Sequence, residues 1–399
     1  MNNDNYKEQM EERMYNFRKA HMKEHPLRAL FLEITLMCNA RCEHCGSSCG
    51  DIIQKNELKL QEWKDLLKKI ADTPGYDPHN IMLFVTGGEP LVRKDWYEIV
   101  SYADQLGYPW GMTTNGILID EDVVKKMEDA HMYSVSVSID GLKETHESFR
   151  KVPGSFEKII KGLKLMNKSK VIKDVQVTTC VNRKNIDQLD DLYELMKKIG
   201  IKNWRIIEVD PIGRAKENDE ILLRKEDFIR MIRFIEEKER ENGDVKVCYG
   251  CGHFLGTQME PRIRKIPFIC ETGIAVASVL SNGNIFVCPD VEKRKELIQG
   301  NVRKDDFIDV WENKFKPFRK LSRTENNMCR NCPDRKLCGG DAFHTWDFDH
   351  NEPNFCIHRM FEEEYDMEKK FKKELEKKLN PKNTTPKKKS VKKKKKTSK

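Results

Sequence analysis

The sequence lacks the long apolar segments of a membrane protein. It contains no run of roughly 18 or more apolar residues, so no transmembrane helix is expected. Residues 1–26 are polar and heavily charged, and they lack the apolar core of a signal peptide. These absences predict a cytoplasmic protein without a membrane span.

The chain also lacks the cysteine pattern of a disulfide framework. It has 13 cysteines, an odd number that cannot pair completely. Because disulfides are rare in the cytoplasm, clustered cysteines there more often bind metal. We therefore expect metal sites rather than structural disulfides.

Most of the chain lacks the excess of basic charge found in nucleic-acid-binding proteins. The formal net charge is +8, but residues 382–399 hold ten lysines and no acidic residue, which leaves −2 for the remainder. This lysine-rich tail is predicted to be disordered. It can contact acidic partners non-specifically, and it does not by itself indicate a specific partner.

A charged helix expected at 6–24 precedes six strand–helix units. The strands are expected at 30–36, 80–86, 109–114, 132–139, 174–181 and 203–209, and the helices at 57–72, 95–106, 120–130, 156–168, 186–199 and 225–241. Strands that alternate with helices predict a parallel sheet. Six units rather than eight predict an α/β fold with a partial (β/α)6, TIM-like barrel. Its chemistry is expected at the carboxyl ends of the strands.

The loop after the first strand carries Cys38, Cys42 and Cys45, spaced Cys-x3-Cys-x2-Cys. Three thiols on one short loop can converge on one small cofactor, and thiolates at this density usually bind iron–sulfur clusters. A [4Fe–4S] cluster held by three thiolates leaves one iron open to a substrate. The alternatives are part of a zinc site, which needs four protein ligands, or cysteines that are merely close together.

This spacing, with His44 before the third cysteine, resembles the signature of the radical S-adenosylmethionine (SAM) family. The segment Gly87-Gly88-Glu89-Pro90, at the end of the second strand, matches the family segment that holds the methionine amino group of SAM. Cys49 is a fourth thiol outside the family pattern. We interpret it as structural or incidental.

Loops after the later strands match the same family in order. The resemblance implies a cofactor-binding loop at Asn115, and it places Ser138 and Asp140 near the ribose or carboxylate of SAM. It also implies that Arg150 pairs with that carboxylate and that Gly213, within 211–215, packs against the adenine. Each of these loops, taken alone, is also compatible with an ordinary turn. Arg150 could equally form a surface ion pair.

Eight further cysteines lie between 248 and 356. Their spacing resembles the SPASM domain, a C-terminal module that binds auxiliary iron–sulfur clusters. One auxiliary site is complete by this resemblance, with the ligands Cys329, Cys332, Cys338 and Cys356.

A second auxiliary site departs from the family pattern. It would use Cys270, Cys288 and a cysteine at position 342, where the chain has Ala342. Cys248 and Cys251 lie upstream and can complete a set of four thiols with Cys270 and Cys288. We expect this set to hold a second auxiliary [4Fe–4S] cluster, with a zinc ion or a lost site as the alternatives.

Asp290 is a candidate catalytic base by this resemblance, because some SPASM enzymes use an acid adjacent to the cysteine that corresponds to Cys288. In this chain Pro289 lies between Cys288 and Asp290. His253, His344 and His350 can serve as acid, base or ligand, but a solvated or structural histidine is the commoner case.

These patterns divide the chain into five parts: an N-terminal helical extension (1–27), a radical SAM core (28–242), a SPASM-like domain (243–360), a charged helix (361–380) and the lysine-rich tail (381–399).

The resemblance implies reductive cleavage of SAM to a 5′-deoxyadenosyl radical, which takes hydrogen from a peptide or protein substrate. Peptide-modifying and anaerobic sulfatase-maturating enzymes are the similar branches, and the products are oxidised or crosslinked. The implied partner is an electron donor such as a flavodoxin or ferredoxin. One alternative substrate is a small-molecule cofactor precursor, such as a tetrapyrrole or quinone precursor. A zinc-containing nucleic-acid-binding protein is a further alternative, which the confinement of basic charge to the tail disfavours.

Overall fold

The computed structural model describes residues 3–50, 56–250, 252–320, 324–354, 356–357 and 359–361. The helix expected at 361–380, apart from its first residue, and the lysine-rich tail lie outside the described residues. No described helix has the length and apolar character needed to cross a membrane.

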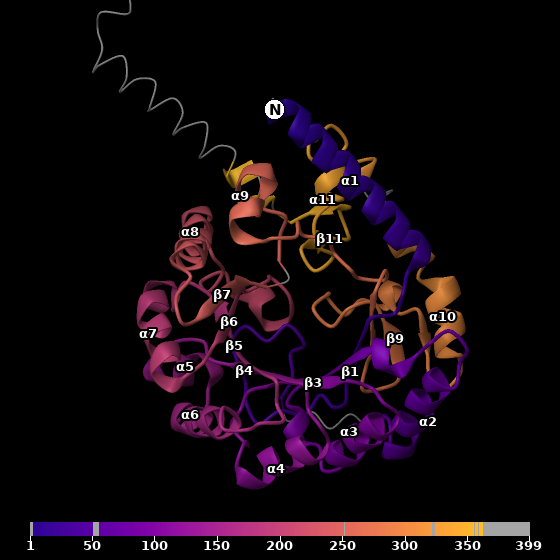
Figure 1. Ribbon diagram of the computed structural model, residues 1–399, viewed down its shortest axis with the longest axis vertical. Coiled ribbons are helices and arrows are strands. Elements are labelled where there is room, and N and C mark those ends of the chain that lie inside the picture. The colour runs from indigo at the N-terminus through magenta and orange to yellow at the C-terminus, as the bar shows by residue number, and fades with distance from the viewer. Residues whose placement is uncertain are drawn as a thin grey trace, which may run out of the picture.

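The six predicted strand–helix units are present and form a curved parallel sheet surrounded by helices (Figure 1). The strands are β1 (Ala29–Glu33), β2 (Met82–Thr86), β3 (Trp110–Thr114), β4 (Ser134–Ser138), β5 (Asp174–Val181) and β6 (Asn203–Glu208). The helices between and after them are α2 (Leu60–Ala71), α3 (Trp96–Gln105), α4 (Glu121–Asp129), α6 (Ser155–Met166), α7 (Leu189–Ile199) and α8 (Lys225–Glu241). A further short helix, α5 (Lys143–Arg150), was not predicted. The predicted α/β architecture is confirmed.

The sheet extends beyond the six predicted strands. β7 (Lys246–Tyr249) continues it in parallel beside β6, and β8 (Val276–Val279) lies parallel to β1 on the opposite side. β9 (Asn284–Phe286) and β10 (Gly300–Asn301) complete that edge in antiparallel fashion. The region expected to be a separate SPASM-like domain therefore contributes strands to the same sheet. These strands have only two to four residues, too few for a period-two pattern to be recognised.

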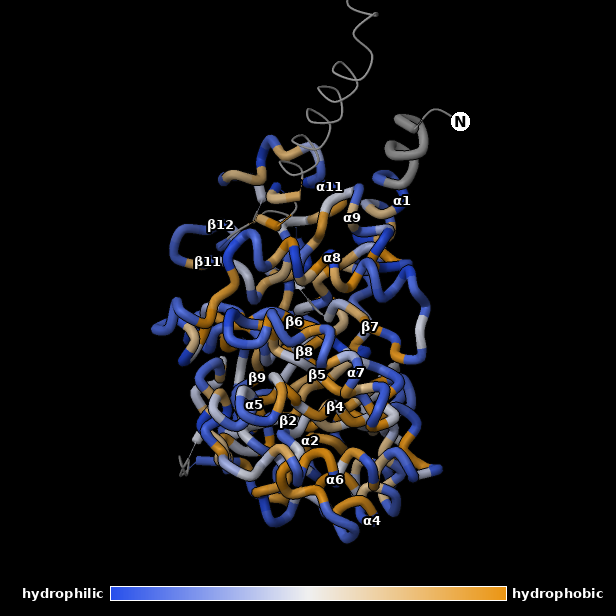
Figure 2. Tube along the Cα trace, turned by 90° about the vertical axis from the view of Figure 1, so that its left-hand side faces the viewer, coloured by the Kyte–Doolittle hydropathy of each residue, from blue (hydrophilic) through white to orange (hydrophobic). Residues whose placement is uncertain are grey.

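Apolar faces of the helices cover the sheet. In α2, Trp63, Leu67 and Ile70 recur at helical spacing, and all three are fully buried. They pack in the same core as Leu30 and Leu32 of β1. Figure 2 shows hydrophobic segments along the strands and inner helices and hydrophilic segments along the outer loops. This core fixes the rim where the carboxyl ends of the strands meet.

The N-terminal helix α1 (Asn3–Glu24) packs beside α11 (Arg335–Cys338), as Figure 1 shows. Arg18 of α1 is buried, and its guanidinium donates to the backbone carbonyls of Lys336 (2.7 Å), Leu337 and Cys338 (3.2 Å). The last carbonyls of a helix have no partner within the helix, so these bonds satisfy the end of α11. The predicted helical extension thus supports a loop more than 300 residues further along the chain.

Two further helices and a two-stranded sheet lie in the described C-terminal part. They are α9 (Gly256–Ile263), α10 (Phe307–Lys314) and the small sheet of β11 (Trp346–Asp347) with β12 (Glu352–Pro353).

Candidate functional site

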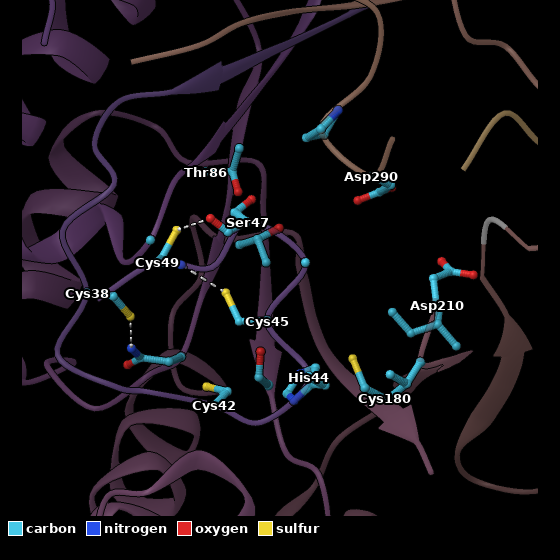
Figure 3. Close-up of a pocket in the computed structure, with 18 of the residues that line it drawn as sticks. Cys38, Cys42, His44, Cys45, Ser47, Cys49, Thr86, Cys180, Asp210 and Asp290 are labelled. Carbon is cyan, nitrogen blue, oxygen red and sulfur yellow. Dashed lines mark hydrogen bonds between the residues drawn. The ribbon is translucent and has the colours of Figure 1, made fainter. Parts of the chain in front are cut away.

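A cavity of about 320 Å³ lies at the carboxyl ends of the strands (Figure 3). Many residues that the sequence singled out line it together: Cys38, Cys42, Cys45, Gly87, Gly88, Asn115, Ser138, Arg150 and Asp290. Their positions differ by up to 252 residues in sequence, from Cys38 to Asp290, and the parallel sheet brings them to one rim. Glu89 and Asp140, which are absent from the lining, are buried directly behind it.

The three thiols of the cysteine loop all reach this cavity. Burial raises the pKa of Cys38 to about 12. The pKa of Cys45 is instead lowered to about 5, chiefly because the Cys49 thiol donates a hydrogen bond to it. The backbone N–H of Cys49 also lies 3.4 Å from the Cys45 sulfur. Since the thiolate is the metal ligand, Cys49 favours the ligating form of Cys45. Cys49 also lines the cavity, but its thiol is engaged with Cys45, and the other three convergent thiols fit a [4Fe–4S] cluster with one open iron.

The loop after β6 holds the cysteine loop in place. The Arg214 guanidinium donates to the backbone carbonyls of Cys42 (2.7 Å) and Cys49 (2.8 Å). Gly213 has a φ of +57°, and a Cβ at this position would lie 2.3 Å from the Gly46 carbonyl oxygen. Glycine is therefore required by this close approach. The structure places Gly213, expected at the adenine, directly against the cysteine loop.

The two glycines after β2 lie against residues 35–37, which follow β1 and lead into the cysteine loop. A Cβ at Gly87 would lie 2.3 Å from the Thr35 carbonyl oxygen, and one at Gly88 would lie 2.3 Å from that of Met37. The backbone bonds in the same place, since the N–H of Gly88 donates to the Thr35 carbonyl at 2.8 Å and the N–H of Glu89 donates to the Met37 carbonyl at 2.9 Å. The absence of side chains lets this segment pack beside the cysteine loop at the cavity wall.

Glu89 is fully buried and accepts three hydrogen bonds from the protein. Its carboxylate receives the Thr114 hydroxyl (2.8 Å), the Asn115 N–H (2.7 Å) and the Leu91 N–H (3.2 Å). Burial raises its pKa, and these donors act in the opposite direction. Pro90 begins a short 3₁₀ turn for which Glu89 is the N-cap. In this structure Glu89 fixes the loop that presents Asn115 to the cavity.

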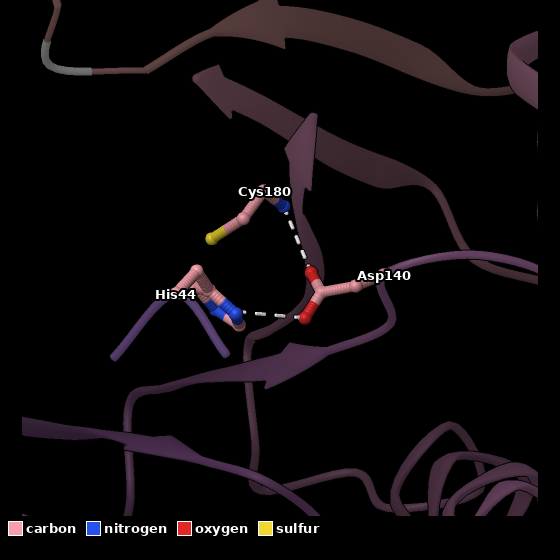
Figure 4. A group of neighbouring side chains, drawn as sticks. All are labelled: His44, Asp140 and Cys180. Atoms are coloured by element: carbon pink, nitrogen blue, oxygen red, sulfur yellow. Dashed lines mark hydrogen bonds and ion pairs between the residues drawn. The ribbon is translucent and has the colours of Figure 1, made fainter. Parts of the chain in front are cut away.

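Asp140 organises a second buried group (Figure 4). It accepts hydrogen bonds from the Arg150 guanidinium at 2.7 Å and the Cys180 N–H at 2.9 Å, and the His44 Nε2 lies 3.7 Å away. Burial raises the pKa of Asp140, but Arg150 and His44 outweigh it and leave the pKa lowered. The His44 ring also stacks on Phe149 with centroids 4.5 Å apart. Arg150, expected to pair with SAM, pairs with Asp140 here.

The four cysteines of the complete auxiliary set line one small cavity: Cys329, Cys332, Cys338 and Cys356. Burial raises the pKa of Cys338 and raises that of Cys356 to about 12. The Asp341 N–H lies 3.1 Å from the Cys338 sulfur and can donate to it. Four thiols around one cavity fit a fully ligated cluster.

The second set remains a prediction. Cys270 and Cys288 are buried, whereas Cys248 lies on β7, at the other end of the sheet order from β8 and β9. Cys251 lies outside the described residues. Ala342, which replaces the expected cysteine, is fully buried.

The wall of the cavity away from the cysteine loop carries acids that the sequence analysis missed. Glu208 and Asp210 line it together with Asp290 and His344. Burial, assisted by Asp290 and Asp341, raises the pKa of Asp210 to about 7. Two acids two residues apart at the end of a strand, Glu208 and Asp210, could have indicated this wall from the sequence.

The three histidines of the C-terminal region differ in surroundings. His253 is fully buried, and its Nδ1 lies 2.7 Å from Asp341 Oδ2. His344 is also buried, with Nε2 3.8 Å from Asp210 Oδ2. His350 is exposed and pairs with Asp347 at 2.7 Å. The expectation of a solvated residue fits His350, whereas His344 lines the cavity and His253 is buried behind its wall, against Glu208 and Asp341.

Comparison with known proteins agrees with this arrangement. The family described as the radical SAM superfamily matches residues 32–196, and the iron–sulfur cluster-binding SPASM domain matches residues 270–333. The chain is 29% identical over 352 residues to the AdoMet-dependent heme synthase of Methanosarcina barkeri, covering 83% of this chain and 97% of the relative. It is 30% identical over 210 residues to the Fe-coproporphyrin III synthase of the same organism, covering 52% and 50% respectively. The solved structure of native anSMEcpe with bound AdoMet and Cp18Cys peptide has a TM-score of 0.66 at 21% identity, covering 85% of this chain and 95% of that chain, which shows a shared fold.

Proposed function

The chain belongs to the radical SAM superfamily and carries a SPASM domain, and we propose that it acts on a tetrapyrrole-type small molecule. The observation that carries this proposal is the relative named a heme synthase, which aligns over almost its full length. A peptide substrate was the first expectation from the sequence. The likeness to the peptide-bound structure concerns the fold alone, whereas the relatives named heme synthase and Fe-coproporphyrin III synthase favour the small-molecule alternative.

The cavity has a feature suited to such a substrate. Arg205 lines it, and its Nε donates to the Thr178 hydroxyl at 3.1 Å. Among the described ion pairs, none joins Arg205 to an acidic side chain. A guanidinium at a cavity wall is suited to bidentate recognition of a carboxylate. Tetrapyrrole precursors of heme carry carboxylate side chains, which gives Arg205 a partner in the proposed complex.

The residues around the cavity have different proposed roles. Cys38, Cys42 and Cys45 would hold the catalytic [4Fe–4S] cluster, and Arg214 and Glu89 keep the neighbouring loops in position. When bound, the cluster and SAM supply one-electron cleavage of SAM and hydrogen abstraction from the substrate. The buried walls of the cavity exclude water from this step.

The auxiliary site lies in the SPASM-like region. Its four cysteines, Cys329, Cys332, Cys338 and Cys356, would hold an auxiliary [4Fe–4S] cluster. Such a cluster would accept or relay an electron left on the substrate. A flavodoxin or ferredoxin is the proposed external electron donor.

The test uses protein purified and reconstituted without oxygen. Iron, sulfide and zinc per chain are measured for the wild type and for a variant with Cys38→Ala, Cys42→Ala and Cys45→Ala. Dithionite-driven formation of 5′-deoxyadenosine is then followed with an iron-containing coproporphyrin, with the metal-free porphyrin and with peptides. We expect deoxyadenosine and a changed porphyrin mass in the wild type, and we expect the triple variant to lose about four irons and all activity.

The same assay separates the alternatives. Deoxyadenosine that forms without any mass change in a porphyrin would refute the substrate proposal and leave the family chemistry intact. A product formed only from a peptide would instead support a peptide substrate.

A further inference from the structure

We propose that Glu208, Asp210 and His253 form a site for a divalent transition-metal ion on the cavity wall away from the cysteine loop. One ligand atom from each residue lies within 4.8 Å of the other two. Glu208 ends β6, Asp210 follows two residues later, and His253 comes from the segment after β7. The parallel pairing of β6 and β7 brings the three side chains together.

Two carboxylate oxygens in this group lack hydrogen-bond partners. Glu208 Oε2 and Asp210 Oδ1 are both inaccessible to water and accept no hydrogen bond. The Glu208 side chain is only 2% exposed. A buried carboxylate oxygen without a partner is costly, so most such atoms in proteins are paired or coordinate a metal. A cation bound by these two carboxylates would remove the cost.

The other atoms of the ligands are held by neighbours. Asp341 accepts a hydrogen bond from His253 Nδ1 at 2.7 Å, which leaves Nε2 of the ring 3.2 Å from Glu208 Oε1. The Tyr249 hydroxyl donates to Glu208 Oε1 at 2.8 Å. A carboxylate on the far nitrogen of a histidine and a donor on a ligating carboxylate are the usual outer partners of protein metal ligands. They orient the ligands before any ion binds.

The ligand set indicates the class of ion. Two carboxylates and one imidazole suit Mn²⁺, Fe²⁺ or Zn²⁺, whereas Ca²⁺ requires six to eight oxygen ligands. Three protein ligands leave coordination positions open, and Glu208 and Asp210 both line the cavity. An anionic group in the cavity could occupy an open position. That use of the ion depends on the proposed function, whereas ion binding itself does not.

The competing explanation is a purely ionic network without metal. A protonated His253 would then offset part of the charge on Glu208, Asp210 and Asp341, and no divalent ion would bind. The two explanations differ in one measurable quantity, the number of divalent ions bound per reconstituted chain.

The experiment titrates Mn²⁺ into the anaerobically reconstituted full-length enzyme, without SAM or substrate. Oxidised [4Fe–4S]²⁺ clusters are diamagnetic, so the EPR signal of free Mn²⁺ reports binding directly. We expect one saturable Mn²⁺ per chain in the wild type, displaced by Zn²⁺ or Fe²⁺. Glu208→Gln and Asp210→Asn should each weaken binding about tenfold or more, and Tyr249→Phe should have a smaller effect. Glu220→Gln, which removes an exposed acid after the same strand, should bind as the wild type does.

Iron content and the circular dichroism spectrum of each variant establish that it has folded and retains its clusters. The proposal is wrong if the folded wild type binds no saturable Mn²⁺. It is also wrong if Glu208→Gln and Asp210→Asn bind Mn²⁺ as tightly as Glu220→Gln. Because neither outcome involves turnover, a failure here is distinguishable from a failure of the tetrapyrrole assay.

Discussion

Replacing Arg18 of the N-terminal helix should loosen the auxiliary cysteine loop. The Arg18 guanidinium donates to three carbonyls at the end of α11, and the residue is only 3% exposed to solvent. A hydrogen bond from a charged donor contributes about 1.5–3 kcal/mol. In Arg18→Ala, water can reach part of the vacated site and bond to some of the freed carbonyls. We therefore expect the local free energy of opening to fall by about 3 kcal/mol, which is less than the summed contribution of three such bonds. At about 1.4 kcal/mol per factor of ten, this raises the local opening constant on the order of 100-fold.

Native-state hydrogen exchange measures this opening at suitable amides. The N–H groups of Cys338 and Gly339 bond to the carbonyls of Asp334 and Arg335, each at 2.8 Å, and they should exchange about 100-fold faster in Arg18→Ala.

Two further variants give the comparison. Arg18→Lys keeps the charge but lacks the guanidinium fork, so its effect should be intermediate. Arg13→Ala changes an exposed arginine on the same helix and should alter stability by less than about 0.5 kcal/mol. If Arg18→Ala and Arg13→Ala exchange at the same rate at these amides, the supporting role of α1 is refuted.

Other parts of the site give shorter predictions. Gly213→Ala should lower the iron content of the reconstituted protein, because the added Cβ would clash with the cysteine loop. In the control Gly154→Ala, φ is also positive (+73°) but no atom lies within 4 Å of the added Cβ, so the iron content should equal that of the wild type. Glu89→Ala should lower the free energy of unfolding in urea by about 2–5 kcal/mol, because it leaves buried donors without an acceptor; equal midpoints with the wild type would contradict this. Arg150 lowers the pKa of Asp140 in the folded protein. The charged Asp140 therefore stabilises the fold above its unfolded-state pKa of about 3.8, and this stabilisation is lost as the pH falls through the folded-state pKa. Asp140→Asn apoprotein should therefore lose less stability as the pH falls below about 4 than the wild-type apoprotein does, and parallel acid curves would refute the ion pair's contribution.

The parts of this structure that the sequence predicted depend on local signals. The helical spacing of Trp63, Leu67 and Ile70 predicted α2 because side chains three and four residues apart share one face of a helix. The spacing of Cys38, Cys42 and Cys45 predicted convergent thiols because all three lie on one loop of eight residues. The parallel direction of β1 to β6 followed from the alternation of strands and helices.

The parts that were missed depend on contacts distant in sequence. Arg18 meets Lys336 across 318 residues, and Glu208 meets His253 through the pairing of two strands. Neither pairing leaves a periodic pattern in the chain. The interpretation of Cys49 as structural or incidental likewise used only the family pattern, whereas its contact with Cys45 requires the folded loop.

The cavity also shows why family membership alone left the substrate open. The cysteine loop and the glycine segment belong to β1 and β2, and they determine the radical chemistry. The opposite wall is built by Asp210 after β6 and by Asp290 and His344 from the SPASM-like region. Because β8 of that region is hydrogen-bonded to β1, its position relative to the cysteine loop is fixed by the sheet itself. Substitutions in the loops that carry Asp290 and His344 can therefore change which molecule fits the cavity while the sheet keeps the cysteine loop unchanged, so differences in substrate between relatives of one fold are expected to map to these loops.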